Sequence, residues 1–88
     1  MDVASEIRRI LVTELFVEVP PERIGPDDSL RDLLGLDSLG FLELRVQCEN
    51  RFDVTIDADD FTPENFATVG RLVGLVHRLR GAALVSDA

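Results

Sequence analysis

The chain contains little cysteine, histidine or lysine, and these shortages exclude several kinds of site. Among its 88 residues there are one cysteine, one histidine and no lysine, so all nine basic residues are arginine. The lone cysteine, Cys48, excludes an internal disulfide and a metal site built on several cysteines. The lone histidine, His77, stands far along the chain from any candidate nucleophile and does not make a catalytic set. We therefore expect no catalytic residues and no metal site.

Long hydrophobic runs are also missing. The composition is 45% hydrophobic, but the longest apolar runs fall far short of the roughly 20 residues that a membrane-spanning helix needs. The first residues include charges at Asp2, Glu6, Arg8 and Arg9, unlike a secretory signal. These observations predict a cytoplasmic protein with no membrane partner.

Positive charge is scarce and unevenly distributed. The net charge is −8, and residues 18–60 carry all of it, with twelve acids against four arginines. Nucleic-acid binding needs basic residues that neutralise phosphates, so we expect no nucleic-acid partner. Concentrated negative charge instead favours steered docking onto basic protein surfaces.

Hydrophobic periodicity predicts an all-α fold. Apolar residues follow helical spacing over 3–17, 38–52 and 67–80, with Gly81 as the last stop signal. Residues 53–58 alternate in polarity but have no partner strand, so we expect an extended connection. One short helical segment is predicted within 57–66, where Thr62-Pro63-Glu64 is a start signal.

A long first loop separates the first two predicted helices. Its apolar residues Ile24, Leu30, Leu33 and Leu34 are expected to pin it to the core, and Asp28 or Ser29 to cap a helical turn at 30–34. The prediction is therefore a monomeric bundle of three main helices, one short helix and a long first loop. A single domain is expected over 1–81, with 82–88 as a flexible tail.

The predicted helix over 38–52 has apolar residues on two sides. One stripe suffices to join a core, so the other needs a separate explanation. The first stripe consists of Phe41, Leu44, Cys48 and Phe52. The second consists of Leu39, Leu42 and Val46, flanked by Glu43, Glu49 and Asn50.

A serine stands at the start of this helix, in the segment Gly35-Leu36-Asp37-Ser38-Leu39. Either Asp37 or Ser38 can be the N-cap, and capping is the common role of a serine at that place. A helix N-terminus also favours an attached phosphate, because its free N–H groups and its dipole attract anions. No base accompanies the serine, so any chemistry there must be supplied by another protein.

The serine segment, followed by Leu42-Glu43-Leu44, resembles the phosphopantetheine attachment motif of acyl and peptidyl carrier proteins. The resemblance extends over about residues 3–80. It includes three further stretches. Residues 24–30 are similar to the first loop of that family, 49–56 to the end of its second helix with the following link, and 61–69 to its third helix and the start of its fourth.

The resemblance implies a four-helix acyl-carrier-like bundle that is not an enzyme. A separate phosphopantetheinyl transferase, which holds Mg²⁺, would attach 4′-phosphopantetheine from coenzyme A to Ser38. The arm would carry acyl groups as thioesters between loading and processing enzymes, each a synthase, transferase or ligase. The family's partner-docking face corresponds here to Asp37, Leu39, Leu42, Glu43, Val46 and Glu49.

The sequence departs from the very acidic carriers of bacterial fatty acid synthesis. Gly40 stands where many members have an acid, and Arg45, Asn50 and Arg51 dilute the acidity of the helix. These departures favour a specialised carrier of a polyketide or other secondary-metabolite pathway. A peptidyl or aminoacyl carrier of a non-ribosomal peptide pathway is the alternative within the family.

We also considered interpretations outside the family. An unmodified acidic helical adaptor would explain the charge and the two-sided helix without using Ser38, and both stripes could also be buried in a small bundle. A Ca²⁺-binding loop beginning at Asp57 is excluded, because its sixth and twelfth positions are Thr62 and Thr68 where glycine and glutamate are required.

Overall fold

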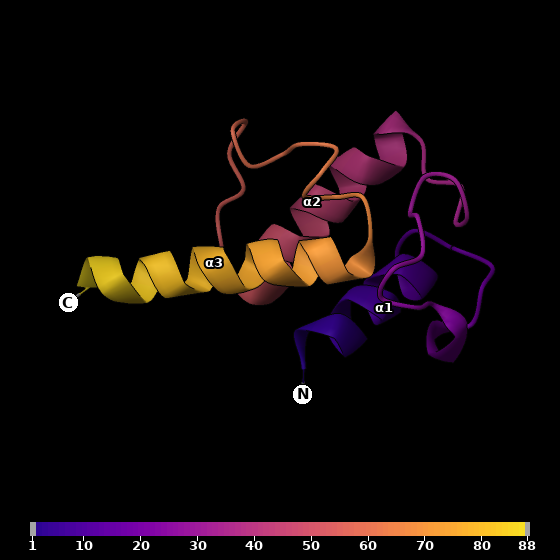
Figure 1. Cartoon of the computed structure of the whole chain (residues 1–88), viewed down its shortest axis with the longest axis horizontal. Coiled ribbons are helices and arrows are strands. Elements are labelled where there is room, and N and C mark those ends of the chain that lie inside the picture. Colours follow the sequence, from indigo (N-terminus) through magenta and orange to yellow (C-terminus); the bar gives the residue numbers. More distant parts are fainter. Residues whose placement is uncertain (1, 88) are drawn as a thin grey trace.

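A computed structural model describes the backbone of residues 2–87 and the side chains of residues 2–81. Within this part of the chain there are three α-helices, one short 3₁₀-helix and no strand (Figure 1). The helices are α1 (Val3–Thr13), η1 (Pro21–Arg23), α2 (Ser38–Phe52) and α3 (Val69–Asp87). The predicted all-α architecture is confirmed. No helix of the described residues is long and apolar enough to cross a membrane.

The α1 helix begins at Val3, as predicted, but ends earlier than its apolar pattern predicts. The Asp2 carboxylate accepts a hydrogen bond from the Ser5 N–H at 2.6 Å, which satisfies a free donor of the first turn. We predicted a helix over 3–17, but it ends at Thr13. Phe16 adopts a left-handed conformation with φ of 59°. That turn lets the Val17 N–H donate to the Leu11 carbonyl at 3.0 Å and buries Val17.

The first loop is fixed to the core by Ile24, Leu30 and Leu36, which are all buried. Leu34 packs partly against the core, but Leu33 is 60% exposed, so its predicted role as a pin is wrong. Ser29 caps the turn that follows, because its Oγ accepts from the Asp32 N–H at 2.9 Å. Pro21 is the first residue of η1, and proline favours the first position of a helix. This short helix was not predicted.

The α2 helix has the bounds predicted from the sequence. Asp37 caps its first turn, and Asp53, with φ of 55°, ends it in a left-handed conformation. The α1 helix packs against both α2 and α3, and its buried stripe, Val3, Ile7, Ile10 and Leu11, forms much of the core. One side of α2, with Leu44, Cys48 and Phe52, is buried in the same core.

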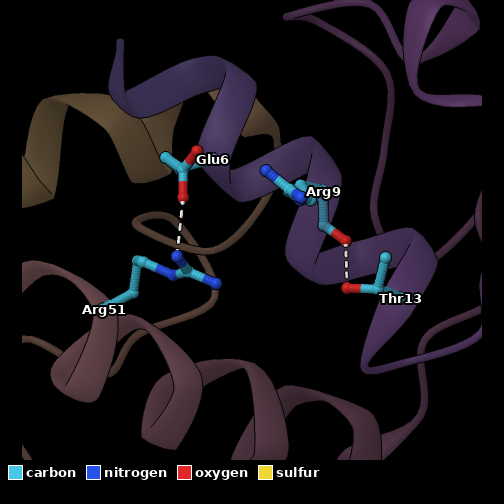
Figure 2. A network of polar contacts seen from close by, with 4 residues as sticks. All are labelled: Glu6, Arg9, Thr13 and Arg51. Atoms are coloured by element: carbon cyan, nitrogen blue, oxygen red, sulfur yellow. Dashed lines mark hydrogen bonds and ion pairs between the residues drawn. The ribbon is translucent and has the colours of Figure 1, made fainter. Parts of the chain in front are cut away.

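An ion pair joins the start of α1 to the end of α2 (Figure 2). Glu6 is buried, and its Oε1 lies 3.1 Å from Nη1 of Arg51, whose side chain is half exposed. The contact is an ion pair and not a well-aligned hydrogen bond. Loss of Arg51 would leave a buried carboxylate without a counter-charge, which would destabilise the fold.

The link between α2 and α3 contains turns in place of a regular short helix. Asp57 Oδ1 accepts from the N–H groups of Asp59 and Asp60, and Thr62 Oγ1 accepts from the Asn65 N–H. The helical segment predicted within 57–66 therefore takes the form of two capped turns, at 58–60 and 63–66. Residues 54–57 have no regular secondary structure, and the two ends of the connection predicted over 53–58 lie in turns, at Asp53 and Ala58.

The α3 helix starts beside the first loop. Thr68 Oγ1 accepts from the Arg71 N–H at 3.1 Å and caps the helix. The Gly70 N–H donates to the Pro26 carbonyl at 2.9 Å, and a Cβ at Gly70 would lie 3.0 Å from that oxygen. The helix continues through Gly81, where we predicted its end. Residue 88 lies outside the described residues, and the domain bound at 81 with a flexible tail at 82–88 stays a prediction.

Candidate functional site

Ser38 is the first residue of α2, and its neighbour Asp37 performs the capping. Asp37 Oδ1 accepts a hydrogen bond from the Gly40 N–H at 2.8 Å. Ser38 is exposed, and no hydrogen bond among the described residues involves its hydroxyl. The common role of a serine at this place is thus taken by the residue before it, which leaves the Ser38 hydroxyl available to an incoming reagent.

The backbone that leads to Ser38 is held firmly. Gly35 has φ of 76°, a conformation that favours glycine, and it turns the chain toward α2. The buried Leu36 donates its N–H to the Leu30 carbonyl at 3.0 Å, and Leu30 donates in turn to the Ala67 carbonyl at 3.0 Å. These bonds connect the start of α2 to the start of α3, so Ser38 sits on a fixed support.

A groove of about 570 Å³ opens beside Ser38, between α2, the first loop and the link before α3. We call it the Ser38 groove. Three aromatic rings line it, and two of them, Phe61 and Phe66, pack edge to face with centroids 5.0 Å apart. The Arg45 guanidinium lies 5.1 Å from the Phe61 centroid. The complete lining is Ser29, Arg31, Asp32, Ser38, Phe41, Leu42, Phe61, Thr62, Pro63, Phe66 and Ala67.

The electrostatics of the site suit an attached anion more than a catalytic reaction. Among the four N–H groups at the start of α2, Gly40 donates to the Asp37 carboxylate and Phe41 to the Asp37 carbonyl. The N–H groups of Ser38 and Leu39 stand in the first turn, at the positive end of the helix dipole. His77 is exposed on α3 and does not line the Ser38 groove.

Neither a metal cluster nor a reactive cysteine accompanies the serine. Among the side chains of residues 2–81, no group of three or more metal-binding residues comes together. Cys48 is fully buried in the core. Burial, and to a smaller extent the neighbouring Glu49 carboxylate, raises the pKa of the Cys48 thiol to about 12. The exposed hydroxyl of Ser38 is therefore the group at this site that an outside enzyme can reach.

The second stripe of α2 is exposed. Leu39 is 75% exposed, Leu42 47% and Val46 46%, so the interpretation in which both stripes are buried is wrong. Glu43 is exposed beside them, and its Oε2 accepts from Gln47 Nε2 at 2.7 Å. These residues and Asp37 form one continuous surface next to Ser38.

Glu49 is placed differently from the other predicted docking residues. It is half-buried, and its Oε2 accepts from the Ile56 N–H at 2.8 Å. The bond fixes the extended link to the end of α2. The structure therefore gives this carboxylate a structural partner. Residue spacing on a helix cannot reveal it, because Ile56 lies beyond the end of α2.

Sequence reasoning missed two exposed apolar residues near the site. The helix predicted over 3–17 includes Phe16, but this residue lies beyond the end of α1 and is 80% exposed. We assigned Leu33 to the core, and it is exposed as well. Both are hydrophobic residues that lack a packing partner in the core. Their exposure can be recognised only from the folded backbone, and not from the sequence.

Known proteins share both the sequence pattern and the fold of this chain. Residues 5–76 match the family model described as a phosphopantetheine attachment site. The chain belongs to this family of phosphopantetheine-binding carrier proteins. It is therefore a carrier on which 4′-phosphopantetheine is covalently attached, and it is not an enzyme itself.

Individual relatives are more specific. The chain is 35% identical to a D-alanyl carrier protein of Streptococcus mutans and 38% identical to one of Streptococcus gordonii. Each alignment covers 93% of this chain and all of the relative. Among solved structures, it is similar to one chain in the crystal structure of Bradyrhizobium japonicum glycine:[carrier protein] ligase complexed with glycylated carrier protein. There the TM-score is 0.67 and the identity 31%, over 84% of this chain and 99% of that one.

Proposed function

We propose that Ser38 carries the phosphopantetheine arm and that the arm holds aminoacyl groups as thioesters. The observation that supports the site is the exposed Ser38 hydroxyl, which makes no hydrogen bond within the described residues while Asp37 caps the helix. A serine in this arrangement can be modified without loss of an interaction that the fold needs.

The attachment reaction places simple demands on this chain. The Ser38 oxygen bonds to the phosphorus that bears pantetheine in coenzyme A, and the phosphoanhydride bond to the adenosine bisphosphate breaks. The serine proton must be taken up by a base of the phosphopantetheinyl transferase, which also holds the Mg²⁺. The chain itself supplies a fixed, reachable hydroxyl.

The residues around Ser38 fit an attached phosphopantetheine. The free N–H groups of the first turn of α2 favour its phosphate, although the Asp37 carboxylate opposes it in part. The Ser38 groove lies beside the attachment point and is lined mainly by apolar side chains, including Phe41, Phe61 and Phe66. When attached, the arm supplies a terminal thiol that forms thioesters, while this chain positions and presents it.

The cargo is the finer part of the proposal. The relatives described above are named for D-alanine and for glycine, and both are amino acids. They support an aminoacyl cargo that a ligase loads in an ATP-dependent reaction. The polyketide or secondary-metabolite pathway, and the acyl cargo that we expected from the weakly acidic α2, receive no support from these relatives.

The exposed stripe of α2 is the proposed docking face for these enzymes. We assign Asp37, Leu39, Leu42, Glu43 and Val46 to it, because they are exposed next to Ser38. We assign Glu49 to the structural contact with Ile56 instead. Apolar side chains edged with acids suit short-lived contact with a basic, partly apolar surface, since complementary charge raises the association rate more than the affinity.

The proposal also includes the setting of the protein. We propose that it acts as a monomer in the cytoplasm, where coenzyme A is available for attachment of the arm. The net charge of −8 supports a monomer that avoids nucleic acid, because it repels other copies as well as phosphates.

Intact-protein mass spectrometry tests the site. The chain is incubated with coenzyme A, Mg²⁺ and a broad-specificity phosphopantetheinyl transferase. We expect the wild type to gain the mass of one phosphopantetheine and Ser38→Ala to gain none. Ser29→Ala is the matched control, because Ser29 lines the same groove, and it should be modified as the wild type is. No gain on wild type, under conditions that modify a known carrier, would contradict the proposal.

The modified protein then tests the cargo. It is offered glycine or D-alanine with ATP and an amino acid:carrier protein ligase, and in parallel malonyl-coenzyme A with a malonyl transferase. We expect an aminoacyl thioester that hydroxylamine releases. Loading by the malonyl transferase and not by the ligase would contradict the aminoacyl cargo and would indicate an acyl carrier of the polyketide type.

A further inference from the structure

A second groove lies on the other side of Ser38. It has a volume of about 750 Å³ and runs between the segment after α1, the turn at 32–36 and the first turns of α2. Its lining includes Asp37 and Leu39, the two neighbours of Ser38. Figure 1 shows the first loop running from the end of α1 to the start of α2. The residues that line the groove come from these three segments. We call it the Phe16 groove.

The exposed hydrophobic side chains of the protein gather here. Within the described part of the chain, the large exposed hydrophobics are Phe16, Leu33, Leu39, Leu42 and Val46. Three of them, Phe16, Leu33 and Leu39, line the Phe16 groove. The other two continue the exposed stripe along α2. An apolar surface that starts at the Phe16 groove and passes along α2 is a feature of protein-binding sites on small soluble domains.

Phe16 is not explained by the stability of the fold. Its backbone has φ of 59°, three residues after the end of α1, a left-handed conformation in which glycine or asparagine is favoured. The turn is needed because it returns Val17 to the core. The side chain at 16, however, is 80% exposed and contributes little burial. A phenylalanine there strains the backbone and leaves a large ring in water, so its benefit must come from a contact outside this chain.

The charges on the groove identify the kind of partner. Five acids line it, Glu14, Glu18, Asp32, Asp37 and Glu43, and no basic residue of the described chain does. A second copy of this chain is a poor occupant, because its net charge is also −8. A partner that seats an apolar side chain against Phe16 and Leu33, with lysine or arginine around it, is complementary in both respects.

Resting on the proposed function, we infer that the Phe16 groove docks the phosphopantetheinyl transferase. This enzyme must bring its reacting phosphorus into bonding distance of the Ser38 oxygen, so it covers the surface on both sides of that residue. Enzymes that act on the cargo reach the distal thiol of the arm, so the docking face on α2 suffices for them and they need no contact with Phe16 or Leu33. Phe16 is therefore a docking residue for attachment, although it lies 22 positions before Ser38 in the sequence.

Two groove variants separate docking from folding. Phe16→Asn removes the ring and places a residue that tolerates the left-handed conformation, so urea unfolding should shift to an equal or higher midpoint. Leu33→Gln removes a second exposed apolar side chain. In steady-state assays with coenzyme A and a purified broad-specificity transferase, we expect each to raise the KM for the carrier about threefold to tenfold, with kcat within about twofold, because only association is weakened.

The matched control is Asp53→Gly. Asp53 is the other non-glycine residue with a left-handed backbone among those described, and it lies at the far end of α2 and lines neither groove. The substitution should raise the urea midpoint and leave the KM unchanged. Added salt should raise the KM of the wild type, because it screens the attraction between the groove acids and a basic partner. For the same reason it should reduce the difference in KM between the wild type and Glu18→Gln, which removes the charge of one groove acid.

Three results would overturn the inference. The first is an unchanged KM in both Phe16→Asn and Leu33→Gln while wild type is modified normally, which leaves the proposed function intact. The second is a fall in kcat that follows a lower urea midpoint, which indicates a structural role. The third is concentration-dependent dimerisation of the wild type that Phe16→Asn abolishes, which assigns the groove to a second copy. Failure of wild type to be modified at all would instead contradict the proposed function.

Discussion

The two sides of α2 are both apolar, yet they have opposite surroundings. Leu44 and Cys48 are fully buried and Phe52 is 8% exposed, whereas Leu39, Leu42 and Val46 on the other side are between 46% and 75% exposed. One side stabilises the folded chain by removing apolar surface from water. The other side gains little from folding, so its apolar character has to be explained by contact with other proteins.

The largest effect that separates the two sides concerns stability. Leu44→Ala removes buried methyl groups and leaves a cavity, so we expect a loss of about 2–5 kcal/mol in the free energy of unfolding. Leu39→Ala, the same change on the exposed side, should alter it by no more than about 0.5 kcal/mol. Urea unfolding followed by far-ultraviolet circular dichroism measures both, since the chain has no tryptophan. Similar losses in the two variants would remove the distinction between the sides.

A smaller effect is expected on the rate of attachment. Glu43→Arg reverses one charge on the exposed side, and we expect it to slow phosphopantetheine attachment at low salt by about tenfold or less. The matched control is Asp59→Arg, which changes net charge equally at an exposed residue that lines neither groove. Equal slowing by both variants would indicate an effect of net charge alone, and not of the docking face.

The smallest effect concerns the chemistry of the buried side. Because burial raises the pKa of Cys48 from 9.0 to about 12, its thiol stays protonated at pH 8 and should not react with iodoacetamide until the protein unfolds. A pKa raised in the folded state adds stability that is complete below pH 9.0 and is lost as the pH rises toward about 12.

Counting alkylated thiols by mass spectrometry tests this directly. The unmodified protein should take up no label at pH 8, and the modified protein should take up one, on the arm. Labelling of the folded, unmodified protein at pH 8 would show that Cys48 is accessible, and the two sides of α2 would then differ less than the structure indicates.

Helix α2 was the easiest element to predict, and the ends of α1 and α3 were the hardest. Local signals fix α2, because an Asx cap precedes Ser38 and the apolar pattern stops at Phe52. In contrast, the helical pattern of α1 continues through Leu15 and Phe16, but burial of Val17 requires a left-handed turn before it. A tertiary contact overrides the local pattern there, and no periodicity analysis contains that information.

The site was predictable in part for a similar reason. Ser38 and the exposed stripe of α2 are neighbours in the sequence, so a motif and a helical wheel place them together. The two grooves combine segments from α1, the first loop, α2 and the link before α3, and only the folded chain brings these together. The bond from Ile56 to Glu49 is likewise invisible before the link has been positioned.

The hydrogen bond between Asp37 and Gly40 has a consequence for the life of the protein. If Ser38 capped α2, each modification would remove a bond worth about 1 kcal/mol, and each removal of the arm would restore it. Because Asp37 performs that task, attachment of the arm at Ser38 would leave this bond of the helix start in place. The same capped helix would then serve the protein before and after attachment.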